Sequence, residues 1–176
     1  NNPNFNYSGR SLFTNIESTK IDKLAASGYE STKTGFSLGT SFEEYENFYF
    51  RPQISLFSEK INTNSTASAA LKKQEGSFFE TKFSYNLDYD LRDKAYQTRE
   101  GTRSIFTQGI PLISDDYGLF NSYEITKWHQ FSNKMTSDLG FYVGAINSLN
   151  DENVKISNRL NLPKKRMRGF KSGRIG

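Results

Sequence analysis

The sequence predicts an all-β chain: an antiparallel, up-and-down transmembrane β-barrel segment of about seven strands, not closed by this chain alone. Hydrophobic residues make up only 35% of the 176 residues, whereas aromatic residues reach 15%. A soluble core usually draws on Leu, Ile and Val, but here large rings alternate with Ser, Thr, Asn and Gly. The alternation runs almost unbroken through residues 77–90, well beyond the ~5–6 residues of a typical globular strand. Long strands with one apolar face are typical of membrane barrels.

Residues 77–90 give the clearest strand. Every second residue from Phe79 to Tyr89 is apolar or Thr, and the opposite parity is mostly polar or charged. Three further segments alternate in the same way: 28–42, 47–57 and 137–146. Three others have strand composition with broken alternation: 8–17, 101–112 and 119–131. Pro52 cannot donate to a ladder, so a bulge or local break is expected there.

The joins between these strands are expected to fall alternately on two rims, because an up-and-down meander puts successive joins at opposite ends. One rim would carry mostly the longer joins, at 19–27, 62–76, 111–116 and from 149 onward. The other would carry 43–47, 91–101 and 132–136, with 91–101 as the long exception. The polar join 62–76 contains a segment, 67–73, that predicts one turn of helix.

Charge and composition exclude several classes of protein. The formal charge is +4, but six of the 23 basic residues lie at 164–174, and residues 1–163 hold 17 basic against 19 acidic side chains. Basicity is therefore local, and no chain-wide nucleic-acid surface is predicted. The chain has no cysteine, which excludes disulfides and thiolate metal sites. No apolar run approaches the ~20 residues of a membrane helix, although membrane strands remain compatible with the sequence.

Few residues suggest catalysis or metal binding. Asp88 and Asp90 share one strand face and could resemble an inverting glycosidase pair, but two acids facing a watery lumen is the simpler interpretation. His129 is the only histidine; it lies beside Trp128 near a strand end and fits an interfacial aromatic girdle better than a triad or metal site. The glycines near the C-terminus match neither phosphate-binding motif.

Two motifs occur in a fixed order. "DLRDKAYQTREGTR" reads as a structured turn, because Asp bonds nearby backbone N–H groups and Gly adopts positive φ. It resembles the turn motif, roughly D-x-R-D-x-x-x-x-P-T-x-G-x-x, of BamA-type outer-membrane protein assembly factors, the bacterial surface antigen family. The matching residues are Asp90, Arg92, Asp93, Thr98 and Gly101, with Gln97 where the family usually has proline.

Some sixty residues later, "MRGF" resembles the R-G-F/Y signature in the sixth extracellular loop of that family. Arg168, Gly169, Phe170 and Gly173 match this second motif, and Met167 replaces the common valine. By resemblance, the loop folds back into the barrel lumen and docks its arginine on acidic and aromatic groups of later strands. Arg168 would then be a docked side chain, whereas the neighbouring lysines would face solvent.

The resemblance implies that residues 1–176 are a partial outer-membrane β-barrel domain, about strands five to eleven of sixteen, ending in the sixth extracellular loop. It implies no enzyme activity, no cofactor and no metal, and an ATP-independent role in folding and inserting β-barrel proteins. The implied partners are outer-membrane lipids, unfolded β-barrel clients and accessory assembly lipoproteins, not nucleic acid. A translocation assembly or two-partner secretion transporter barrel, and a soluble β-sandwich binding module, stay open as alternatives.

Overall fold

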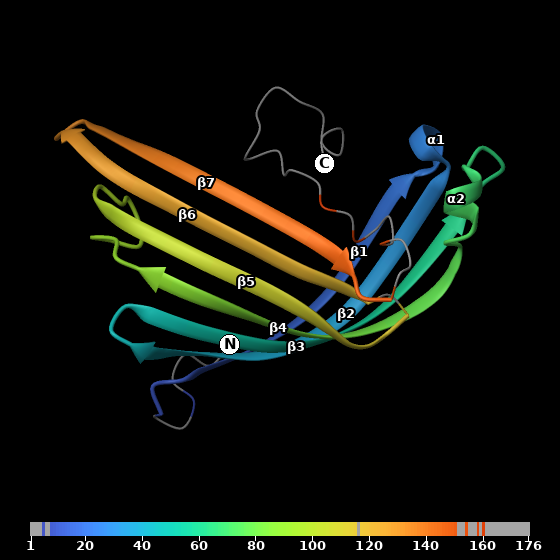
Figure 1. The fold of residues 1–176 in the computed structure, drawn as a ribbon, viewed down its shortest axis with the longest axis horizontal. Coiled ribbons are helices and arrows are strands. Elements are labelled where there is room, and N and C mark those ends of the chain that lie inside the picture. Colours follow the sequence, from blue (N-terminus) through green and yellow to red (C-terminus); the bar gives the residue numbers. More distant parts are fainter. Residues whose placement is uncertain are drawn as a thin grey trace.

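The computed structural model describes residue 5, residues 8–115 and 117–150, and residues 154, 158 and 160. These residues form a single seven-stranded sheet in the order β1-β2-β3-β4-β5-β6-β7, and each strand is antiparallel to the next (Figure 1). The strands are β1 (Ser11–Lys23), β2 (Tyr29–Tyr45), β3 (Phe48–Thr63), β4 (Gly76–Asp90), β5 (Gly101–Ser114), β6 (Gly118–Ser132) and β7 (Met135–Ser148). Two single-turn helices, α1 (Leu24–Ser27) and α2 (Ala69–Lys72), lie in joins.

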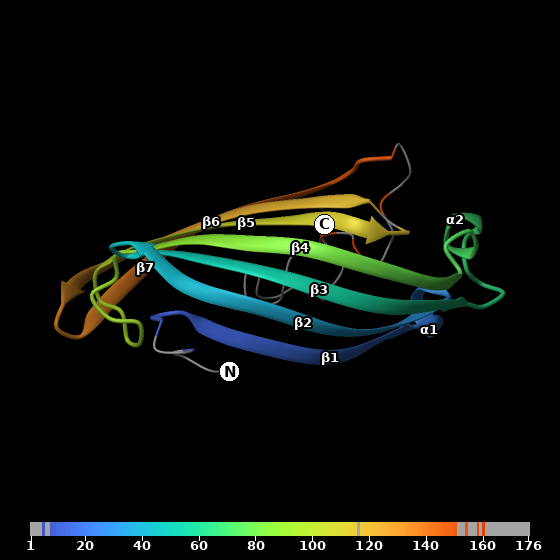
Figure 2. The ribbon, with the colours of Figure 1, turned by 90° about the horizontal axis from the view of Figure 1, so that it is seen from below.

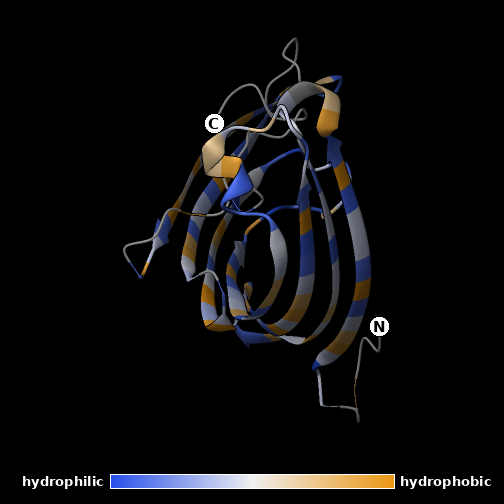
Figure 3. Cartoon of the chain, turned by 90° about the vertical axis from the view of Figure 1, so that its right-hand side faces the viewer, coloured by the Kyte–Doolittle hydropathy of each residue, from blue (hydrophilic) through white to orange (hydrophobic). Residues whose placement is uncertain are grey.

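The sheet curls along its whole width into an open half-barrel (Figures 1 and 2). Its free edges are β1 and β7, and no second sheet packs on it in the described part of the chain. A soluble β-sandwich, which needs two facing sheets, is therefore excluded as the architecture of these residues. Viewed from one end, the strands show alternating hydrophobic and hydrophilic residues (Figure 3), as expected when one face meets lipid and the other a polar lumen.

The convex face carries large apolar side chains, called here the outer belt. Its exposed members include Phe36, Leu38, Ile54, Leu56, Phe79, Phe141 and Val143. Rings continue across neighbouring strands: Phe42 and Phe50 are 5.7 Å apart, and Tyr85 lies 5.9 Å from Phe50 and 6.2 Å from Phe106 between ring centroids. Such a band of exposed rings and aliphatic groups is unfavourable in water and favourable in a bilayer.

All seven expected strands are present, but several extend further than predicted, most of all β1 and β3, which end at Lys23 and Thr63 and not near residues 17 and 57. Residues 19–23 continue β1 instead of forming a loop, and residues 111–114 continue β5, with a register shift near Leu112. The expected break at Pro52 is confirmed: the β2–β3 ladder passes from Gly39–Gln53 to Phe42–Phe50 without a pair at Pro52, while the β3–β4 pairing is continuous there.

The joins divide between two rims, as predicted. The rim that carries α1 and α2 is called here the helix rim, and it includes the long join 64–75. Its two helical joins are tied together, because Asn64 N donates to Gly28 O at 2.9 Å and Asn64 Nδ2 donates to Leu24 O at 3.2 Å. The opposite rim, called here the turn rim, has short turns after β2 and β6 and the longer turn 91–100.

Among the described residues, none of the helices has the length and apolar character needed to cross a membrane, a finding that does not bear on membrane-spanning strands.

Candidate functional site: the turn after β4 and the inner wall

The turn 91–100 is held by its own side chains. Arg92 donates from Nε to Asp90 Oδ1 at 2.7 Å and from NH2 to Asp90 Oδ2 at 2.6 Å, and its NH1 reaches Ala95 O at 3.2 Å. The guanidinium also lies over the ring of Trp128 on β6, 5.7 Å from its centroid. A two-pronged ion pair of this kind fixes the direction of the arginine as well as its position.

The second half of the turn is closed by Asp93. Its Oδ1 accepts from the backbone N–H groups of Arg99 at 3.0 Å and Glu100 at 3.2 Å, and the Asp93 N–H donates to Glu100 O at 3.1 Å. The two bonds that Oδ1 accepts, of which the one from Arg99 has the larger effect, hold the pKa of the Asp93 carboxyl below its usual value. Thr98 Oγ1 donates to Lys94 O at 2.7 Å.

Gly101 ends the turn at a place where no side chain fits. Its φ is 115°, and an added Cβ would lie 2.7 Å from Arg92 Cα and still closer to Leu91 O. Only glycine accepts both the backbone angle and this approach. Gln97 has φ of 53°, which a proline ring cannot adopt, so a proline would not fit this backbone at position 97.

Asp88, expected to face a watery lumen, is instead buried in an ion network on the concave face. Its side chain is only 1% exposed, and it accepts from Arg103 Nε at 2.9 Å and Arg103 NH2 at 2.7 Å. Arg51 on β3 adds a third contact at 2.9 Å, and Arg103 also approaches Asp90 at 3.7 Å. Because two arginines neutralise Asp88, it is unsuited to act as one of two free catalytic acids, and the glycosidase-like interpretation is wrong.

A second cluster lies on the same wall nearer the helix rim. Glu80 is between Lys33, at 3.0 Å, and Lys82, at 3.8 Å. Lys33 is 4.4 Å from the ring centroid of Phe57, and Lys82 is 6.0 Å from that of Phe120. Phe57 faces its register partner Gly35, where a Cβ would collide with the ring, so the glycine leaves room for the aromatic side chain.

The structure brings together all five predicted turn residues, Asp90, Arg92, Asp93, Thr98 and Gly101, in one turn. The four predicted loop residues, Arg168, Gly169, Phe170 and Gly173, lie outside the described residues. His129 is exposed and contacts Phe131 at 4.8 Å near the turn rim, which fits the predicted girdle, whereas its neighbour Trp128 belongs to the turn. No group of acids and histidines that could hold a metal occurs in the described part of the chain.

Several residues of the site were not predicted from the sequence: Arg51, Arg103 and Trp128, and the Lys33–Glu80–Lys82 cluster. Arg51 and Arg103 lie on the polar parity of the strands that flank β4, and register alone brings them to Asp88. The available signal was the presence of opposite charges on the same predicted face of three consecutive strands. Trp128 reaches the turn because it pairs with Gly101 across β5 and β6.

Comparison with known proteins assigns the family. A model of the Omp85 superfamily domain matches residues 1–176, which is the whole chain. The chain belongs to the Omp85 superfamily. Its half-barrel also matches the crystal structure of BamA from Haemophilus ducreyi lacking POTRA domains 1-3, with a TM-score of 0.71 and 17% identity, covering 86% of this chain. No curated protein matches it.

The Omp85 assignment explains the two faces of the sheet. Omp85 barrels reside in the bacterial outer membrane and are non-enzymatic transport or assembly proteins. The outer belt is then the lipid-facing surface, and the ion networks of Asp88 and Glu80 line the lumen. The chain covers 32% of the BamA chain that it matches, and the seven strands correspond to part of that barrel.

Proposed function

We propose that this chain is part of a BamA-type assembly factor that folds and inserts β-barrel proteins into the bacterial outer membrane without ATP or cofactor. The observation that carries the proposal is the half-barrel itself, which follows the BamA barrel over most of the chain and presents an outer belt to lipid. Unfolded β-barrel proteins would be the clients, with accessory lipoproteins in the complete assembly.

The turn 91–100 supports the proposal because it is built for rigidity. All of the residues that match the BamA-type turn make a bond or a steric contact within it, from the Asp90–Arg92 pair to Gly101. In the proposed orientation the turn rim faces the periplasm and the helix rim faces the cell exterior. The strands would be the fifth to eleventh of a 16-stranded barrel, and residues 168–173 would belong to the sixth extracellular loop.

The physical work in such a protein is the pairing of backbone groups. A client strand in a bilayer must satisfy its N–H and C=O groups without water, and an open barrel edge offers those partners. No catalytic side chain is required for this role. The docked arginine of the loop, Arg168, would position the loop inside the lumen through bidentate bonds to a carboxylate.

The test is complementation in cells depleted of the intact protein that carries this chain. Arg168→Ala should reduce outer-membrane levels of several unrelated β-barrel proteins, while Lys164→Ala and Lys165→Ala should leave them unchanged. Equal small losses from all three variants would indicate a charge patch and not a docked arginine.

Depletion of the intact protein distinguishes the proposed function from the functions of the two related kinds of barrel. Loss of one exported protein with normal barrel assembly would instead indicate a two-partner secretion transporter. Defects confined to a few barrel proteins would indicate a translocation assembly barrel. General loss of barrel proteins from the outer membrane is the result expected here.

A further inference from the structure

Three polar side chains cross the outer belt in one hydrogen-bonded row. The Tyr85 hydroxyl donates to Gln108 Oε1 at 2.9 Å, and Gln108 Nε2 donates to Asn121 Oδ1 at 2.6 Å. The three are register partners on β4, β5 and β6, and their parity is that of the convex face. Polar groups facing lipid are costly unless they are paired, and this row pairs them in series.

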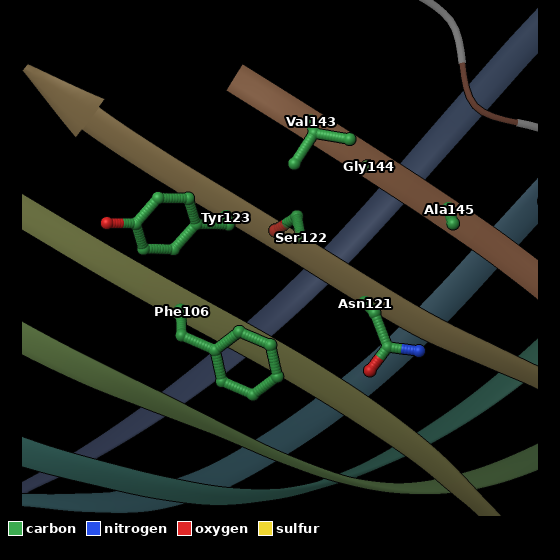
Figure 4. Close-up of a pocket in the computed structure, with 7 residues that line it drawn as sticks. All are labelled: Phe106, Asn121, Ser122, Tyr123, Val143, Gly144 and Ala145. Atoms are coloured by element: carbon green, nitrogen blue, oxygen red, sulfur yellow. The ribbon is translucent and has the colours of Figure 1, made fainter. Parts of the chain in front are cut away.

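The row ends in an unused donor. Asn121 accepts through its oxygen, but its Nδ2 has no acceptor among the described residues, which include both neighbouring strands. Figure 4 shows the Asn121 oxygen on the β5 side and the nitrogen turned away from that strand. A chain of bonds that donate in one direction polarises its last donor, so the Asn121 amide is a strong site for an acceptor.

An apolar groove lies beside this donor. Its walls are Phe106 and Tyr123 on one side and Val143 and Ala145 on β7, and Asn121 is its polar side chain on the convex face (Figure 4). The groove has a volume of about 170 Å³ and is open to the outside of the sheet. Ala145 makes the opening, since it contributes only a methyl group where the same row carries Asn121 and Gln108.

We propose that this groove binds one lipid molecule of the leaflet on the helix-rim side, with its acyl chain in the groove and its ester carbonyl accepting from Asn121 Nδ2. The groove is continuous with the outer belt, which is the bilayer contact of the barrel. Only one outward-facing residue of β6, Leu119, separates Asn121 from the helix-rim end of the strand, and acyl chains join their headgroups near such a strand end. The inference rests on the outer-membrane location and not on the assembly role, so its failure leaves that role untouched.

The test uses the intact protein that carries this chain, purified as a folded barrel, and native mass spectrometry. The probes are a diester phosphatidylethanolamine and its diether analogue with the same chains, which lacks the carbonyl. The wild type should retain one diester molecule about tenfold more tightly than the diether, the factor expected for one hydrogen bond. Asn121→Leu should bind both probes equally, at the diether level, while Thr81→Val, elsewhere on the convex face, should keep the preference.

A second variant tests the groove without disturbing the polar row. Ala145→Phe fills the groove with Asn121 in place and should lower retention of both probes. Heat-modifiable gel mobility confirms that each variant folds, and if Asn121→Leu does not fold, the two probes on the wild type and on Ala145→Phe decide the matter. Equal retention of both probes by the wild type, or no effect of Ala145→Phe, overturns the proposal. The proposal is also overturned if the groove holds a protein partner that Ala145→Phe displaces.

Discussion

Replacing Asp88 by Asn should weaken the barrel wall more than any other single acid-to-amide change in the described strands. The carboxylate is 1% exposed and makes three contacts of 2.7–2.9 Å with two arginines. Removing one partner of a buried ion network costs about 3–5 kcal/mol. Arg51 is 36% exposed and can recover water, and Arg103 keeps Asp90 at 3.7 Å. The expected loss of unfolding free energy is therefore about 2–3 kcal/mol, below that range.

The measurement is urea unfolding of the intact protein in lipid vesicles, with the folded fraction monitored by heat-modifiable gel mobility. Asp138→Asn is the matched control, because Asp138 is an exposed acid on the same concave parity at the edge strand β7 and should change stability by less than about 0.5 kcal/mol. Arg51→Met should cost less than Asp88→Asn, since Arg103 still neutralises the carboxylate. Equal effects of Asp88→Asn and Asp138→Asn would refute the claim that the wall depends on this buried network.

Three smaller predictions concern the turn. Gly101→Ala should destabilise by about 2–4 kcal/mol in the same urea assay because of its φ of 115° and the steric overlap, whereas Gly140→Ala, with its nearest contact at 3.6 Å, should be close to neutral. The turn lowers the pKa of Asp93. The Asp93 carboxylate should therefore stabilise the turn fully above the unfolded pKa of about 4, and this stabilisation should disappear as pH falls through the lower folded pKa. Amide exchange of the turn would show this, and Asp93→Asn should abolish the pH dependence. Trp128→Leu should cost about 0.5–1 kcal/mol through lost contact with the Arg92 guanidinium, and no measurable loss would argue against that contact.

Much of the fold was predictable because one face of each strand had to be apolar. Residues 77–90 reveal both the strand and its parity, and the structure keeps both. Strand ends were predicted less well because the requirement for an apolar face applies only within the outer belt. Residues 19–23 are mostly polar, and once a strand leaves the belt its pairing no longer needs an apolar face; the ladder with β2 alone keeps them extended.

The site was predictable where its contacts are local. Asp90 and Arg92 are two residues apart, and Asp93 bonds within its own turn, so residue types and spacing were enough. The Arg51–Asp88–Arg103 network requires the register of two hairpins, which the sequence pattern does not specify to the residue. The outward row from Tyr85 to Asn121 could not be predicted for another reason. Isolated polar residues on the apolar face of separate strands indicate no pattern until the strand register places them side by side.

Two buried acids of the inner wall, Asp88 and Glu80, already have cationic partners, and this bears on the proposed docking of Arg168. Asp88 lies between two arginines and Glu80 between two lysines. An arginine entering the lumen could bind either acid only by displacing cations that would then be left unpaired, at a cost that one new ion pair does not offset. An acid without such partners is the better acceptor. The proposed docking of Arg168 therefore directs the search for its partner toward the part of a full barrel that these seven strands do not form.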